Sequence, residues 1–134
     1  SIGALFDRPA LSVNHFYHYS YAHKKNDIFL FKKIKNSKGQ VQNFTNLFNH
    51  NFYEKYPNSI SLMIKHGYEV LDNTSDEILE ATKELLTLDS GDMKYSSRNA
   101  KQQLFVDSLP ETSCFKYMDS RISSYFQKKN PELF

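Results

Sequence analysis

The chain has 134 residues, a formal net charge of +2, 40% hydrophobic residues and 24% charged residues. This length suffices for one ordinary hydrophobic core, and the composition is that of a globular protein rather than a disordered chain. The charge excess is too small to indicate binding to nucleic acid or to an anionic membrane surface. The single cysteine, Cys114, excludes an internal disulfide and is typical of a reducing compartment. No apolar run approaches the roughly 20 residues that span a bilayer.

A short helix, a tight turn and a buried strand are predicted for the opening stretch SIGALFDRPALSVN. Pro9 fixes its own φ and disfavours helix at Arg8, so a strand from Ala10 to Val13 follows and closes at Asn14. The sequence begins without Met or a leader segment, so no signal peptide is visible and the chain looks like part of a longer one.

The start of this first helix is the best chemical clue in the sequence. Three residues stand there: Ser1, Ile2 and Gly3. Free backbone N–H groups and the positive end of the helix dipole favour an anion at such a position. A helix that starts in this way before a buried strand is also common in α/β proteins that bind nothing there, so a purely structural role stays open.

Histidines and aromatic residues crowd the segment HFYHYSYAHKKN, residues 15–26, for which we predict a loop or an irregular helix. No cysteine accompanies the histidines and none has the i, i+4 spacing of a helical metal site, so a metal is not favoured. The aromatic rings either cover a sheet edge, which is their commoner role, or stack on a base or sugar. A strand is predicted at residues 27–34 and a turn at 36–39, and their lysines are either solvated or reach a phosphate.

Local signals define the middle of the chain. Thr45 is predicted to cap a helix through about Phe52, and a second helix from residue 60 ends at Gly67, before a strand at 68–71. Thr74 and Glu77 form a capping box that predicts a helix from Ser75 to Leu88. Its apolar face is Ile78, Ala81, Thr82 and Leu85, widened by Leu79, Leu86 and Leu88. Two of its carboxylates, Glu80 and Glu84, are predicted to lie on its solvated side.

Two further helices are predicted in the tail, one capped at Ser96 or Ser97 and one that begins at Asp119 or Ser120. The order of elements is that of an α/β layer finished by helices. We therefore predict a single domain over residues 1–134. Within it, residues 1–90 form the α/β part and residues 91–134 form a helical C-terminal extension.

Several segments together carry a family resemblance. They are SIGALFDRPALSVN, DIFLFKKI with its Gly39 turn, NFTNLF, GYEVLDNTSDEILEATKELL and the closing SRISSYFQKKNPELF. These segments resemble the C-terminal part of GT-B-type glycosyltransferases, and most of all a bacterial family encoded with surface-polysaccharide genes. The resemblance covers nearly the whole chain, although each matching piece is short.

The resemblance implies a partial Rossmann-like layer of short parallel strands with flanking helices and a helical tail, which holds a nucleotide-sugar donor in an interdomain cleft. By position it assigns the donor diphosphate to Ser1, Ile2 and Gly3 and makes Asn14 and His15 face the cleft. It implies no metal and no cofactor besides the donor substrate. The catalytic base of such enzymes comes from the N-terminal domain, so no catalytic residue is assigned and the chain is not expected to be active alone.

The implied partners are the nucleotide-sugar donor, a glycan or lipid-linked acceptor and the N-terminal domain, but no nucleic acid. The implied location is the cytoplasm, and peripheral association with a membrane is compatible with it. Two other function classes stay open. One is another GT-B-shaped sugar-nucleotide enzyme, such as an epimerase. The other is a non-enzymatic module that binds nucleic acid or a partner through Lys24–Lys38 and the Tyr/Phe loop.

Overall fold

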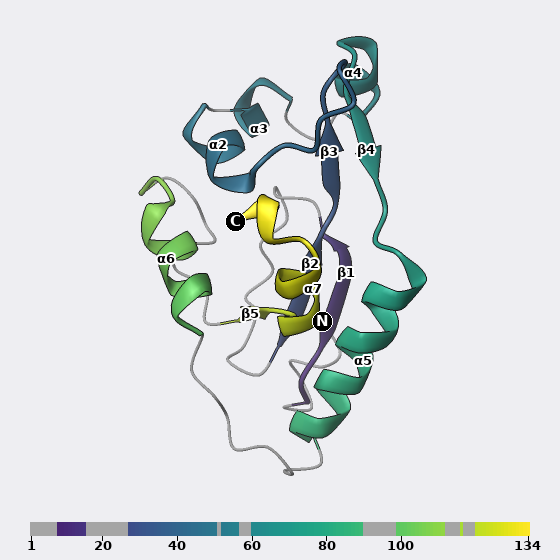
Figure 1. The fold of residues 1–134 in the computed structure, drawn as a ribbon, viewed down its shortest axis with the longest axis vertical. Helices are drawn as coiled ribbons and strands as arrows, with labels where there is room; N and C mark the ends of the chain where they lie inside the picture. The colour runs from purple at the N-terminus through teal and green to yellow at the C-terminus, as the bar shows by residue number, and fades with distance from the viewer. Residues whose placement is uncertain are drawn as a thin grey trace.

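The computed structural model describes residues 8–15, 27–50, 52–56, 60–89, 99–111, 116 and 120–134. The first predicted helix and most of the loop rich in His and aromatic residues lie outside them. A small parallel sheet forms the centre, in the order β1 (Leu11–His15), β2 (Ile28–Phe31) and β5 (Arg121–Ile122). Every residue of β2 is buried, as expected for the central strand of a parallel sheet. The protein is a mixed α/β structure in which helices flank this sheet (Figure 1).

The apolar run at residues 27–34, which the sequence predicts as one strand, is two strands in different sheets. After β2, β3 (Lys33–Lys35) pairs antiparallel with β4 (Glu69–Leu71), so β4 is not part of the parallel layer. The break is at Lys32, whose ammonium lies 2.7 Å from the Asp72 carboxylate just beyond β4. The middle residue of β3 is also buried, and periodicity therefore does not reveal the break.

Three short helices lie at the end of the molecule toward which β2 points (Figure 1): α2 (Phe44–Asn49), α3 (Phe52–Lys55) and α4 (Ile60–Lys65). The predicted cap at Thr45 is wrong. Asn43 takes that role, because its Oδ1 accepts the Asn46 N–H at 3.1 Å. Phe52, predicted as the end of the same helix, instead begins α3.

The predicted end of α4 at Gly67 is confirmed. Gly67 has a φ of 87°, which is the left-handed conformation that glycine adopts without strain. Its N–H donates to the Ile64 carbonyl, and the Tyr68 N–H donates to the Met63 carbonyl, each at 3.0 Å. These two bonds form a Schellman motif, which satisfies the last carbonyls of the helix and turns the chain into β4.

The predicted capping box and the helix that it starts are confirmed. In α5 (Ser75–Asp89), the Glu77 N–H donates to Thr74 Oγ1 at 3.2 Å, and the Thr74 N–H donates to Glu77 Oε2 at 2.9 Å. Both bonds join residues three positions apart in sequence, so the local sequence alone specifies them.

The faces of α5 differ from the prediction in two respects. Leu79 and Leu86 are 51% and 61% exposed, so they do not widen the buried face. Glu84, predicted to be solvated, has a side chain only 13% exposed. Its carboxylate lies 3.3 Å from the Arg121 guanidinium and accepts the Ser124 N–H at 3.0 Å. The tail therefore packs on the side of α5 that the sequence predicts to face water.

The tail, predicted to be helical, also supplies a strand. The predicted cap of the next helix at Ser96 or Ser97 is wrong, because α6 (Ala100–Ser108) is capped by Asn99, whose Oδ1 accepts the Gln102 N–H at 2.8 Å. The predicted helix start at residue 119 or 120 is wrong, because residues 121 and 122 form β5 beside β2. The helix α7 (Ser124–Lys129) then begins after its cap Ser123, and a 3-10 turn (Pro131–Leu133) ends the chain.

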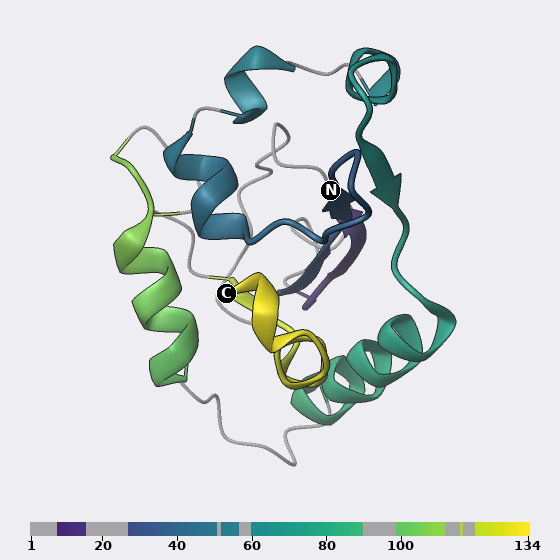
Figure 2. The same ribbon diagram turned by 45° about the horizontal axis from the view of Figure 1, so that its top comes forward.

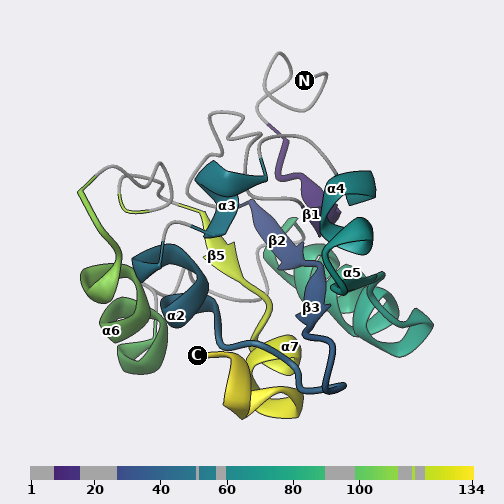
Figure 3. The ribbon, with the colours of Figure 1, turned by 90° about the horizontal axis from the view of Figure 1, so that it is seen from above.

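Aromatic side chains join the tail to the rest of the core. The ring of the last residue, Phe134, packs edge to face on Phe44 of α2, Phe105 of α6 and Phe126 of α7. Such pairs stabilise a fold by about 0.5–1.5 kcal/mol each beyond the area they bury. On the other side, α5 packs on β1, β2 and α7, whereas α6 lies across the molecule from α5 (Figures 2 and 3).

A buried carboxylate links the first turn of α5 to β3 and to the end of α7. The Glu77 side chain is 3% exposed, and its Oε1 accepts Lys33 Nζ at 2.6 Å and Asn130 Nδ2 at 3.2 Å. Burial alone raises the pKa of Glu77. The hydrogen bonds from Lys33, the Thr74 N–H and Asn130, together with the Lys33 charge, outweigh burial and lower this pKa from its usual 4.5.

Because the pKa of Glu77 is lowered in the folded state, its ionised form stabilises the fold at neutral pH, and this contribution is lost as the pH falls below about 4.5. We expect Glu77→Gln to be less stable than the wild type at pH 7 but to lose less stability on acidification. Urea denaturation at a series of pH values measures both. Identical pH dependence of the two proteins would contradict this assignment.

The caps of α2 give a second prediction. Asn43→Ala removes the acceptor for the Asn46 N–H and should lower the free energy of unfolding by about 1 kcal/mol. The control is Thr45→Ala, two residues later, for which we expect a smaller loss. A larger loss for Thr45→Ala than for Asn43→Ala in urea denaturation would show that Thr45 is the cap after all.

Candidate functional site

The carboxyl ends of β1 and β2 meet at one edge of the sheet, which is where open α/β sheets bind ligands. The pairs Ser12–Phe29 and His15–Phe31 enclose one residue more on β1 than on β2, so β1 contains a bulge. Asn14 lies in this bulge with a φ of 52°, the left-handed conformation that asparagine tolerates better than most residues. The bulge therefore changes the direction of the last residues of β1.

Two asparagines fix this edge by binding each other's backbone. The Asn14 N–H donates to Asn73 Oδ1, and the Asn73 N–H donates to Asn14 Oδ1, both at 2.6 Å. The Nδ2 of Asn73, a residue 8% exposed, also donates to the Phe31 carbonyl at 2.7 Å. One buried side chain thus joins the ends of β1 and β2 to the segment that leads into α5.

The N-terminus of α5 reaches the same edge, but its own carboxylates disfavour an anion there. Its capping box occupies the N–H groups of Thr74 and Glu77, and Asp76 adds a second carboxylate in the first turn. These negative groups complement the helix dipole and would repel a phosphate. Beside them lies the Lys32–Asp72 pair, whose side chains are 20% and 69% exposed.

The structure describes only some of the predicted site residues. Ser1, Ile2 and Gly3 lie outside the described residues. His15 is the last residue of β1, and its side chain is not among those described. Asn14 lies within β1 at the carboxyl edge, but its N–H and Oδ1 already bind Asn73, which leaves Nδ2 as the group that can donate to a ligand.

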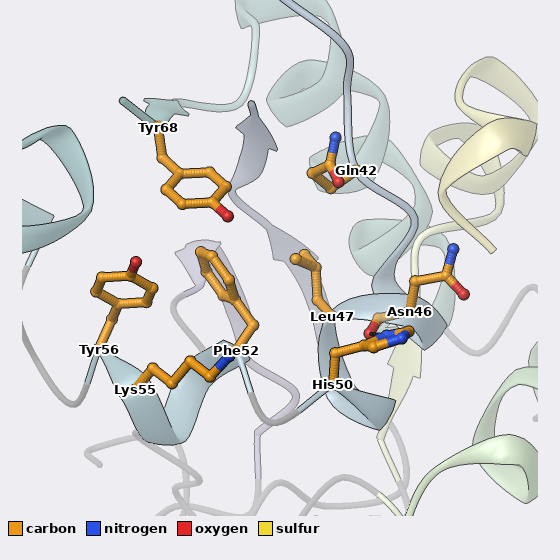
Figure 4. Close-up of a pocket in the computed structure, with 8 residues that line it drawn as sticks. All are labelled: Gln42, Asn46, Leu47, His50, Phe52, Lys55, Tyr56 and Tyr68. Carbon is orange, nitrogen blue, oxygen red and sulfur yellow. Dashed lines mark hydrogen bonds between the residues drawn. The ribbon is translucent and has the colours of Figure 1, made fainter. Parts of the chain in front are cut away.

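A pocket of about 330 Å³ lies between α2, α3 and the start of β4 (Figure 4). Eight described residues line it: Gln42, Asn46, Leu47, His50, Phe52, Lys55, Tyr56 and Tyr68. Leu47, Phe52 and Tyr56 are buried and form its apolar wall. The volume is at the lower end of the range for small-molecule sites, which suits a single ring rather than a whole nucleotide.

Hydrogen bonds hold two side chains of this pocket in place. The Tyr56 hydroxyl and His66 Nδ1 are 2.8 Å apart, and His50 Nδ1 lies 2.8 Å from the Asn46 carbonyl. Since a carbonyl only accepts, His50 Nδ1 carries the proton, and in the neutral ring Nε2 is then an acceptor.

Neither the Asn14–Asn73 pair nor this pocket was predicted from the sequence. Asn73 precedes the capping box in the run DNTSDE, which is the one local sign of its role. The pocket residues come from several elements and share no periodic pattern, so nothing in the sequence groups them.

Comparisons of the chain with protein-family models, with curated proteins and with solved structures returned no significant match. Among the described residues, no group of three or more His, Cys, Asp and Glu side chains is placed to hold a metal ion. Across the same residues, no helix combines the length and the apolar character needed to cross a membrane.

The asparagine pair gives a testable prediction. Asn73→Ala leaves the Asn14 N–H and the Phe31 carbonyl without these partners, so we expect the free energy of unfolding to fall by about 2–3 kcal/mol. Asn14→Gly and Asn14→Ala both remove Oδ1, but only glycine adopts a positive φ without strain. Asn14→Gly should therefore be the more stable of the two by about 1 kcal/mol in urea denaturation. Equal stabilities would contradict the left-handed conformation of Asn14.

Proposed function

We propose that this chain is the donor-binding portion of a glycosyltransferase, which transfers a sugar from a nucleotide-sugar to a surface-glycan acceptor. The observation that carries the proposal is the convergence at the carboxyl edge of the parallel sheet. There, the bulged end of β1 is bound to the segment before α5 through Asn14 and Asn73. Ligands of open α/β sheets bind outside such an edge. The resemblance of the sequence segments to GT-B-type enzymes supports the same conclusion, including a Rossmann-like arrangement.

In this proposal the donor diphosphate binds the backbone N–H groups of Ser1, Ile2 and Gly3 at the start of the first predicted helix. The self-capped N-terminus of α5 supports this assignment, because it removes the competing helix start at the same edge. Asn14 Nδ2 donates to an oxygen of the donor, and His15 follows it along the cleft. The reaction needs a base from the N-terminal domain.

The charge distribution favours this function over a nucleic-acid-binding module. Two of the lysines in the most basic segment are engaged by carboxylates: Lys32 by Asp72 at 2.7 Å and Lys33 by Glu77 at 2.6 Å. Each such pair removes positive charge that a phosphate backbone would otherwise attract. The charge of this segment therefore supports the transferase function over binding to nucleic acid.

The test is titration of the full-length protein with a panel of nucleotide sugars, followed by calorimetry on two variants. Gly3→Asp places a carboxylate beside the proposed diphosphate and should weaken donor binding roughly tenfold or more. The control is Thr74→Ala, which should lower the free energy of unfolding by about 1 kcal/mol and leave donor affinity unchanged. Unchanged affinity in Gly3→Asp, or a selective loss in Thr74→Ala, would contradict the assigned phosphate site.

A further inference from the structure

The pocket between α2, α3 and β4 has the chemistry of a separate binding site. It uses none of the residues of the donor edge described above. Its wall contains three aromatic rings, and Figure 4 shows the Tyr68 hydroxyl directed into the space that Leu47 and Gln42 border on the other side. Apolar surface and polar groups therefore face the same small volume.

The packing of the three rings indicates which kind of ring fits. The ring planes of Phe52 and Tyr68 are inclined at 75°, and their centroids are 4.9 Å apart. The ring planes of Phe52 and Tyr56 are inclined at 47°, and their centroids are 5.0 Å apart. The ring planes of Tyr56 and Tyr68 are inclined at 67°. No two of these rings are parallel, so they do not form a slot for a flat base. A sugar ring fits better, because its C–H groups pack on aromatic carbon while its hydroxyls reach polar groups at the edge.

The charge of the pocket indicates which charge its ligand carries. Lys55 is exposed and carries the one full charge among the eight described lining residues, none of which has a carboxylate. Its ammonium extends from α3 along the aromatic wall in Figure 4. The amide of Gln42 and the hydroxyl of Tyr68 supply neutral hydrogen-bonding groups nearby. An anionic group on the ligand therefore has a partner at this site, whereas a cationic one does not.

We propose that this pocket binds a single sugar ring that bears a carboxylate, a hexuronic acid unit. The ring packs on the aromatic wall, Tyr68 and Gln42 bind its hydroxyls, and Lys55 pairs with its carboxylate. The binding itself is independent of the transferase reaction. Only its use as the site of an acidic sugar in the acceptor glycan rests on the proposed function.

Saturation-transfer NMR on the full-length protein tests this site with four probes: glucuronate, glucose, glucosamine and uridine monophosphate. Glucuronate should bind about fivefold more tightly than glucose, which is the contribution of one solvent-exposed ion pair. Glucosamine, which carries a positive charge, should bind most weakly. Uridine monophosphate should not compete with glucuronate. Equal affinities for glucuronate and glucose, or competition by the nucleotide, would overturn the proposal.

Two variants and a matched control locate the binding. Lys55→Met keeps the alkyl chain and should reduce glucuronate affinity about fivefold, to that of glucose, without changing glucose binding. Tyr68→Phe keeps the ring and should weaken both sugars. Lys65→Met removes an exposed lysine at the end of α4, outside the pocket, and should change neither. If Lys55→Met and Lys65→Met behave alike, glucuronate binds elsewhere and the proposal is wrong.

The two proposals fail separately. Unchanged nucleotide-sugar binding in Gly3→Asp, with glucuronate binding intact, would overturn the donor-phosphate assignment and leave the pocket proposal standing. Conversely, if nucleotide sugars bind the wild type but no probe sugar does, the pocket proposal falls while the transferase proposal stands. If glucuronate binds and no nucleotide sugar does, the pocket is a sugar site in a protein that is not a glycosyltransferase.

Discussion

The buried carboxylate of Glu77 is the interaction on which the arrangement of this protein depends. It lies in the first turn of α5 and binds Lys33 of β3, the Thr74 N–H and Asn130 at the end of α7. Removing one partner of a buried ion pair leaves an uncompensated charge, at a cost of about 3–5 kcal/mol. The carboxylate therefore requires the small antiparallel sheet and the end of the chain to meet at the start of α5, although they are far apart in sequence.

Asn73, which precedes the capping box of α5, holds the parallel sheet against the start of the same helix. Asn73 binds the end of β1 through Asn14 and the end of β2 through the Phe31 carbonyl. A stretch of five residues, 73–77, thus positions both the carboxyl edge and the tail. In the proposed transferase, this gives a donor site whose floor is set by buried hydrogen bonds, while the phosphate-binding N–H groups come from another helix start.

The second site arises from a different kind of interaction. The break at Lys32 directs the chain out of the parallel sheet into β3. The helices α2 and α3 then lie at the end of the molecule toward which β2 points. The rings of Phe52 at the start of α3, Tyr56 just after α3 and Tyr68 just before β4 form the aromatic wall of the pocket, and α2 adds Leu47. No periodic pattern brings Tyr68 next to Phe52. Their proximity follows from the Schellman turn at Gly67 and from the pairing of β3 with β4.

The sequence by itself determined two features whose hydrogen bonds close within a few residues, although it did not identify Asn43, whose bond is equally local, as the cap of α2. The two features are the capping box of Thr74 and Glu77 and the helix end at Gly67. Only the tertiary structure decided the role of Asn73, the burial of Glu84 and the strand β5. Each depends on a partner about 40 residues or more away in the chain, such as the Ser124 N–H for Glu84. A local sequence pattern reports helix, turn and cap preferences, but it does not encode which distant group will satisfy a buried polar atom.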